Sequence, residues 1–212
     1  MNTERLVAML ATQPETASAP ALQRYAIAMG CGAGVAALLM ALLLGVRHDL
    51  GAVILLPAFW GKVLFGACLA VGSLVAAARL SRPGVRLAWA PGALALPVVA
   101  MWLFAALELA QAAPSERMPL VLGETWRSCP LLIAMLSAPV FVAVLWAMQG
   151  LAPTRPRLAG AAAGLLAGTT GALVYTLHCP ELAAPFLGSW YLVGMLIPAA
   201  AGALAGPRVL RW

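Results

Sequence analysis

The sequence predicts an all-α fold, a polytopic bundle of six transmembrane helices with both termini on the cytoplasmic side of the membrane. Hydrophobic residues make up 63% of the 212 residues, and charged residues make up only 9%. A soluble domain needs more charge than this to cover its surface. The apolar residues gather in six stretches, most of them close to the about 20 residues that a membrane-spanning helix needs.

The distribution of basic residues predicts the orientation of these helices. Cytoplasmic connections of membrane proteins carry an excess of Lys and Arg. With the N-terminus in the cytoplasm, nine of the 13 basic residues fall in inner segments. The positive net charge therefore fits an anionic membrane surface rather than direct nucleic-acid binding. The four basic residues of the outer segments are Arg47, Lys62, Arg117 and Arg127.

A cytoplasmic N-terminal segment, residues 1–24, precedes a six-span transmembrane domain, residues 25–212. Asn2 or Thr3 can cap a short helix with an apolar face, which Pro14 and Pro20 then end. Because so short a helix is marginally stable alone, it needs a membrane surface or the groove of a partner protein. A flexible tail is the alternative. The apolar residues of this segment are Leu6, Val7, Met9 and Leu10.

The six spans follow in order, separated by brief connections. The first lies after 24 residues that include Glu4 and Glu15, which indicates a retained anchor rather than a cleaved signal peptide. The second is short and is expected to recruit part of residues 57–62. Pro, Gly and Arg residues end the inner helices at 81–86 and 152–157. The expected spans are Tyr25–Val46, Val63–Ala78, Leu87–Leu107, Pro130–Met148, Leu158–Leu177 and Phe186–Leu204.

Glycines recur every four residues in two of these spans, at Gly160, Gly164 and Gly168 and at Gly30 and Gly34. Small residues at this spacing let helix backbones approach closely. We expect them to pack helices within one bundle, and dimerisation is the alternative.

The polar residues exclude several classes of function. As drawn, the spans contain no Asp, Glu, Lys, Arg or His, whereas ion-coupled transporters keep such groups at membrane depth. The sequence has no Ser, His and Asp in a convincing catalytic-triad arrangement. It also lacks an HExxH zinc motif, a glycine-rich phosphate loop and a CxxC motif. We therefore do not expect an enzyme. A channel or transporter for a small solute stays open as an alternative.

Two cysteines, Cys129 and Cys179, are expected at the outer water boundary, where polar reactants reach them. Each precedes a proline, Pro130 or Pro180, which disfavours helix at the cysteine itself and suits a helix that starts just after it. For Cys129, the dipole of the fourth span and the neighbouring Arg127 favour the thiolate. Cys31 and Cys68 lie inside apolar spans and are expected to be packing residues.

The surroundings of this pair leave three uses open. A permanent disulfide would staple two outer loops in an oxidising compartment, as in a purely structural membrane subunit. An exposed, activated pair would equally suit a redox sensor. His178 and Glu181 beside Cys179 make transient binding of a soft or heavy metal a third use, with Cys129, Cys179 and His178 as ligands. No resident cofactor is expected.

Six spans, a short N-terminal helix, Trp126-Arg127-Ser128-Cys129-Pro130, Leu177-His178-Cys179-Pro180-Glu181 and a terminal Leu-Arg-Trp resemble the NrsF-type integral membrane anti-sigma factors of proteobacteria. The resemblance covers essentially the whole chain. It implies a regulator of the bacterial inner membrane that holds an extracytoplasmic-function (ECF) sigma factor through residues 1–20. It also implies that Cys129 and Cys179 respond to oxidants or heavy metals during stress. Trp126, Arg127, Pro130, His178, Pro180 and Glu181 would support that pair.

Overall fold

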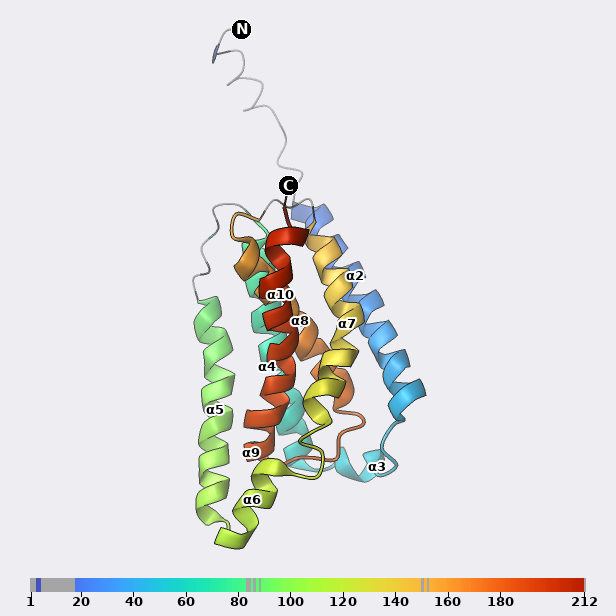
Figure 1. Cartoon of the computed structure of the whole chain (residues 1–212), viewed down its shortest axis with the longest axis vertical. Helices are drawn as coiled ribbons and strands as arrows, with labels where there is room; N and C mark the ends of the chain where they lie inside the picture. Colours follow the sequence, from blue (N-terminus) through green and yellow to red (C-terminus); the bar gives the residue numbers. More distant parts are fainter. Residues whose placement is uncertain are drawn as a thin grey trace.

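A computed structural model describes residues 3–4, 18–82, 85, 87, 89–149, 151 and 153–211. Within these residues the chain is all-α, and six helices are long and apolar enough to cross a membrane, so the predicted fold class is confirmed (Figure 1). Leu6, Val7, Met9 and Leu10 lie outside the described residues. The helices are α2 (Ser18–Leu39), which continues into a π-helical turn (Met40–Leu44), α3 (Leu50–Val53), α4 (Pro57–Leu80), α5 (Ala90–Gln111), α6 (Pro114–Leu122), α7 (Cys129–Met148), α8 (Pro156–Tyr175), α9 (Ala184–Phe186), a second π-helical turn (Leu187–Tyr191) and α10 (Leu192–Val209).

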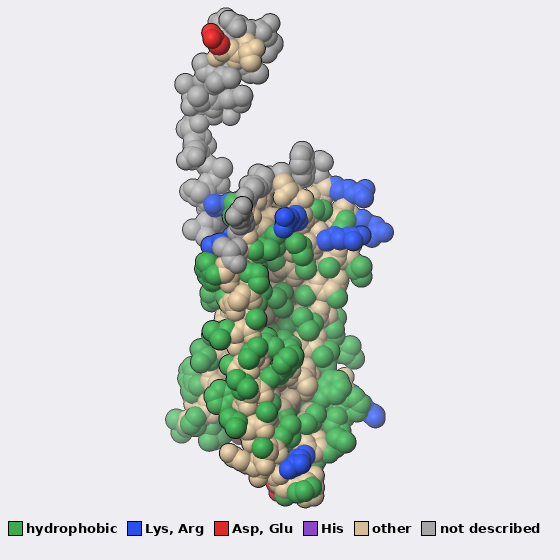
Figure 2. All heavy atoms as spheres, turned by 90° about the vertical axis from the view of Figure 1, so that its left-hand side faces the viewer, with side chains coloured by type: hydrophobic (Ala, Val, Ile, Leu, Met, Phe, Trp, Pro, Cys, Tyr) green, Lys and Arg blue, Asp and Glu red, His purple; other side chains and the backbone are tan. Residues whose placement is uncertain are grey.

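The six long helices run up and down, so the start of α2 and the end of α10 lie at one end of the bundle, here called the terminal end (Figure 1). The cysteine end, with Cys129 and Cys179, lies opposite. On the face shown in Figure 2, Lys and Arg side chains gather mainly at the terminal end, and the surface between the two ends is largely apolar. Arg24, Arg79, Arg82, Arg155, Arg157, Arg208 and Arg211 belong to the terminal end by their positions in the chain.

The helix α4 begins six residues earlier than the span predicted at Val63. Leu56 is extended and Pro57 occupies the first turn, where its fixed φ and missing N–H are tolerated. As a result, Lys62 lies one turn inside the helix. Arg79 near the end of α4 and Glu108 near the end of α5 are helical as well. The prediction that the spans carry no ionisable side chain was therefore wrong.

The central helix α8 packs most closely against α10 through its glycines. A Cβ atom at Gly160 would overlap the backbone of Gly202, and one at Gly164 would overlap the backbone of Pro198. Packing within one bundle is thus confirmed for this helix. Gly30 and Gly34 on α2 instead have open space around them, and it is Gly32 that meets Val140 of α7.

Replacing Gly164 by leucine is expected to destabilise the bundle by about 3 kcal/mol, because the side chain would force α8 and α10 apart. Thermal unfolding of the purified protein in detergent measures this loss. Gly34→Leu is the matched control, since it makes the same change in a helix where a Cβ meets nothing. Equal unfolding temperatures for the two variants would contradict this account of the α8–α10 contact.

Candidate functional site

The two predicted cysteines meet at the cysteine end of the bundle. Cys129 is the first residue of α7, and Cys179 lies in the cysteine loop, residues 176–183, which joins α8 to α9. Both are free thiols of one buried apolar cluster, and each side chain affects the pKa of the other. Local hydrogen bonds fix the two backbones, from Cys129 N to Thr125 O (2.8 Å) and from Cys179 N to Tyr175 O (2.9 Å).

Both sulfurs are buried, contrary to the expectation that water reaches them. Each cysteine is 0% exposed and belongs to an apolar cluster with Tyr175, Phe186 and Tyr191. The sequence places the two residues at helix ends, but the cysteine loop and the turn before α7 fold over them. Cys31 and Cys68, expected to be packed, are the exposed cysteines, on the outer faces of α2 and α4.

A buried lysine, Lys62 of α4, lies beneath the cysteine loop. Its side chain is 1% exposed, and Nζ donates to the carbonyl oxygens of Glu181 (3.0 Å) and Cys179 (3.4 Å). The ammonium also lies 4.9 Å from the centre of the Tyr191 ring. Tyr191 ends a π-helical turn at the start of the last span, and such turns are frequent at functional sites.

From the sequence, Lys62 was used only as one of the basic residues of the outer segments. The sequence nevertheless contains a pattern that indicates its burial. Starting the helix at Pro57 places Lys62 three, seven and eleven residues before Phe65, Leu69 and Ser73, and this spacing follows one helix face. All four residues are buried. An ionisable side chain on the buried face of a membrane helix is a functional candidate.

The electrostatics of the pair favour a thiolate at Cys179. The hydrogen bond with Cys129 is the largest cause that lowers the pKa of Cys179, followed by the charge of Lys62 and its hydrogen bond. Burial opposes them, and the resulting pKa is about 6. The direction of this shift favours the thiolate at Cys179 over the thiolate at Cys129.

The cysteine loop is tied to the far end of the first span. Arg47 Nη1 donates to the carbonyl oxygen of Cys179 (3.1 Å), and Arg47 N donates to that of Leu177 (3.1 Å). The same guanidinium pairs with Asp49 (2.7 Å). His178 Nδ1 is hydrogen-bonded to the carbonyl oxygen of Gly45 (2.9 Å), where the chain turns with φ of 76°. Movement of the loop therefore acts directly on the end of the first span.

Glu181 ties the loop to the turn that precedes α7. Its Oε1 accepts hydrogen bonds from Glu124 N (2.8 Å) and Thr125 Oγ1 (3.4 Å). The carboxylate lies where a Cβ of Gly123 would be, and Gly123 adopts a left-handed φ of 57°. Both cysteine-bearing segments are thus joined by the carboxylate as well as by the thiols.

The remaining predicted residues pack around the pair. Trp126 stacks on Trp190, with ring centres 5.1 Å apart, and Pro130 is buried at the start of α7. Pro180 is exposed. Arg127 was expected to favour the Cys129 thiolate. In the structure its guanidinium instead lies over the Trp126 ring, 4.9 Å from the ring centre.

The set proposed for metal binding is not assembled in this conformation. The ring of His178 turns to Gly45 and stacks on Tyr175, so it does not join the sulfurs as a third ligand. Throughout the part of the chain that the structure describes, no three His, Cys, Asp or Glu side chains form such a group. Of the three predicted ligands, Cys129 and Cys179 lie in one buried cluster.

Comparison with known proteins gives consistent matches along the chain. The family described as "Negative regulator of sigma F" (NrsF) matches residues 10–212. A protein of Azospira oryzae named "Probable anti-sigma-F factor NrsF" is 63% identical over 213 residues, which cover 100% of both chains. The "Anti-sigma-F factor NrsF" of Caulobacter vibrioides is 41% identical over 218 residues, again covering 100% of both. No solved structure matches the chain.

Proposed function

The chain belongs to the NrsF family of negative regulators of sigma F, and from this membership we propose that it is a membrane-bound anti-sigma factor. It sequesters a sigma factor of the ECF type through its N-terminal segment and releases it when Cys129 and Cys179 are oxidised. Its role is regulatory rather than catalytic. The observation that carries the proposal is that Cys129 and Cys179 lie in one buried cluster, at the end of the bundle opposite to the start of α2 and the end of α10.

In this proposal the terminal end faces the cytoplasm and the protein lies in the bacterial inner membrane. The arginines at the ends of α4 and α10 and between α7 and α8 support this orientation, because basic residues concentrate on the cytoplasmic side. The sigma factor then meets residues 1–20 in the cytoplasm. The cysteine end faces the periplasm, which is an oxidising compartment.

The proposed signal is conversion of the dithiol to a disulfide by a peroxide. The Cys179 thiolate attacks one peroxide oxygen, forms a sulfenic acid and expels hydroxide, which takes up a proton to give water. The Cys129 sulfur then attacks the sulfenic sulfur and displaces a second hydroxide, which is protonated by the proton that Cys129 gives up. The net reaction consumes two thiols and one hydrogen peroxide and yields one disulfide and two waters.

Oxidation changes the charge balance around Lys62. In the reduced pair the ammonium faces the Cys179 thiolate as well as two carbonyl oxygens. A disulfide carries no charge, so oxidation removes the anion beside Lys62 Nζ and leaves the two carbonyl oxygens as its partners. Removing one partner of a buried ion pair typically costs about 3–5 kcal/mol. This cost favours rearrangement of the cysteine loop relative to α4.

The first span offers a route from the loop to the sigma-binding segment. At one end, Gly45 and Arg47 are hydrogen-bonded to the cysteine loop. Along its length, α2 packs on α7, the helix that begins with Cys129, with Gly32 against Val140. At its other end α2 continues into the N-terminal segment. Displacement of either cysteine segment would therefore move α2, the helix that follows residues 1–20 in the chain.

Replacing Leu6 or Leu10 by aspartate is expected to reduce the sigma factor recovered with the membrane protein by about tenfold or more, because each change puts a charge into an apolar contact. Deletion of residues 1–20 is expected to abolish recovery. Co-purification from membranes, with the sigma factor quantified against the membrane protein, measures both effects.

The matched control is Ala8→Asp, which places the same charge on the opposite side of a helix at this spacing. It is expected to retain the sigma factor. Undiminished recovery after deletion of residues 1–20 would overturn this part of the proposal and assign the partner to the inner loops.

A further inference from the structure

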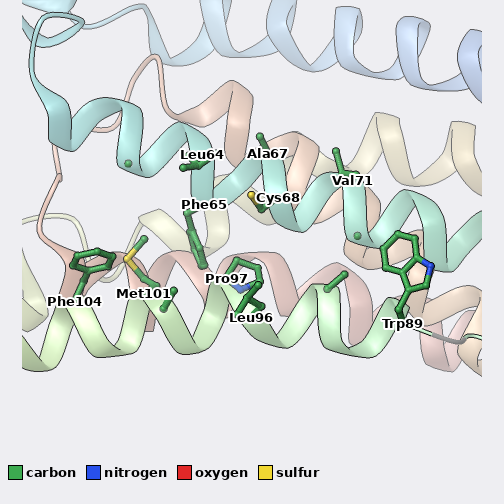
Figure 3. Close-up of a pocket in the computed structure, with 14 residues that line it drawn as sticks. Leu64, Phe65, Ala67, Cys68, Val71, Trp89, Leu96, Pro97, Met101 and Phe104 are labelled. Carbon is green, nitrogen blue, oxygen red and sulfur yellow. The ribbon is translucent and has the colours of Figure 1, made fainter.

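A cavity of about 600 Å³ lies between α4 and α5, away from the cysteine pair (Figure 3). Apart from the sulfur atoms of Cys68 and Met101 and the indole nitrogen of Trp89, the side chains that line it are hydrocarbon. Leu96 and Phe104 at its rim are 72% and 64% exposed, so the cavity opens to the outside of the bundle, where the membrane lies. This volume falls in the range of small-molecule sites, about 300–1,000 Å³.

Contacts at several heights hold α5 in the bundle, and the cavity lies where α4 and α5 face each other with small residues. Towards the cysteine end, Trp102 Nε1 donates to the carbonyl oxygen of Gly188 (2.9 Å), and Glu108 accepts from Ala184 N (2.9 Å). At the terminal end, the guanidinium of Arg79 lies 5.3 Å from the centre of the Trp89 ring. Between these contacts both helices present small residues, among them Gly61, Ala67, Ala93 and Ala100.

The groove is long and narrow. From Trp89 to Phe104 it follows 15 residues of α5, which corresponds to about 22 Å at the helical rise of about 1.5 Å per residue. That is most of the about 30 Å hydrocarbon thickness of a bilayer. Its shape fits an extended hydrocarbon chain parallel to the helices. Phe65 and Met101 form its buried side, and both are packed in the buried cluster around the cysteines.

The end of the groove at Trp89 is positively charged. Arg79, on the last turn of α4, has its guanidinium beside the Trp89 ring. Arg82 follows three residues later in the chain, just after the end of the helix. Arginine recognises phosphate oxygens through paired hydrogen bonds. A second copy of this chain in the same orientation would bring its own basic terminal end to this level, where like charges repel. The combination of an apolar groove and a basic end therefore selects an anionic amphiphile.

We propose that this groove binds one anionic phospholipid, with an acyl chain between α4 and α5 and the phosphate at Arg79 and Arg82. The site is separate from the dithiol and does not depend on the proposed sigma-factor function.

Native mass spectrometry of the full-length protein, reconstituted with phosphatidylglycerol or with phosphatidylcholine and released from detergent, tests the proposal. The wild-type protein is expected to retain one phosphatidylglycerol and to hold phosphatidylcholine at least about tenfold more weakly, from the two arginines. Arg82→Gln is expected to narrow this preference about fivefold. Gly61→Leu is expected to abolish retention, because a Cβ there meets nothing but the open groove.

Gly34→Leu, an identical change at an open position of α2, is the control and is expected to retain the lipid. Cys68→Phe fills the middle of the groove and serves if Gly61→Leu lowers the unfolding temperature. Equal retention of both lipids by the wild-type protein would overturn the proposal. So would phosphatidylglycerol retained by both groove-filling variants, or a dimer that Gly61→Leu dissociates.

Discussion

Replacing Cys179 by serine is expected to abolish the release of the sigma factor by peroxide. Serine keeps the size of the side chain but removes the nucleophile, so no sulfenic acid forms. Cys129→Ser is expected to abolish release as well, because a Cys179 sulfenic acid then has no thiol to close a disulfide. The measurement is the fraction of sigma factor that remains on washed membranes before and after peroxide.

The matched controls lie in the same chain. Cys31→Ser and Cys68→Ser also remove one thiol each, but both cysteines are exposed on the outer faces of the helices. These two variants are expected to release the sigma factor as the wild-type protein does. A normal response in both Cys129→Ser and Cys179→Ser would exclude the dithiol as the sensor, whatever holds the sigma factor.

Replacing Lys62 by methionine is expected to slow the reaction of Cys179 with an alkylating reagent at pH 7 by about tenfold. Methionine preserves length and apolar volume but removes the positive charge beside the thiolate. In the wild-type protein the rate is expected to rise with pH through about 6, the pKa of Cys179, and to level off above it. In Lys62→Met the rise is expected at a higher pH, because the neutral thiol is then favoured until more base is present.

Arg117→Met is the control for Lys62→Met, because it removes a charge at the same end of the bundle but from an exposed position. Its pH profile is expected to match the wild-type profile. Quantitative mass spectrometry of the alkylated Cys179 peptide follows both variants. A profile that does not move in Lys62→Met would mean that Lys62 only anchors the carbonyl oxygens of Cys179 and Glu181.

The number and type of helices could be predicted because apolar stretches of sufficient length leave little alternative in a chain with so few charges. The short apolar stretch of the second span predicted an extension into residues 57–62, but not the residue at which α4 starts, because hydropathy places a helix end at the first charge, Lys62. In the structure Pro57 determines that start instead. The charge of Lys62 is satisfied by carbonyl groups more than a hundred residues away, and no local pattern records such a contact.

In the candidate site, too, local features could be predicted from the sequence, whereas contacts between distant residues could not. The Cys-Pro pattern predicted the start of α7 to within one residue, because proline suits the first turn of a helix, although Cys129 itself is helical. No helix starts at Pro180, since α9 begins at Ala184. The burial of Cys129 and Cys179 in one cluster depends on how the cysteine loop folds over α7, through Glu181 on one side and Arg47 on the other. Arg127 was misassigned for a related reason: it adjoins Cys129 in sequence, but the side chain stacks on Trp126.

Formation of a Cys129–Cys179 disulfide and release of the sigma factor can be followed together in one membrane sample as peroxide is added. Peptide mass spectrometry gives the fraction of chains with the disulfide, and quantitative blotting gives the fraction of sigma factor still bound. The bound fraction is expected to fall in proportion as the disulfide fraction rises, and a reductant is expected to reverse both. Release of the sigma factor while both thiols stay reduced, or full disulfide with the sigma factor still bound, would contradict release through this disulfide.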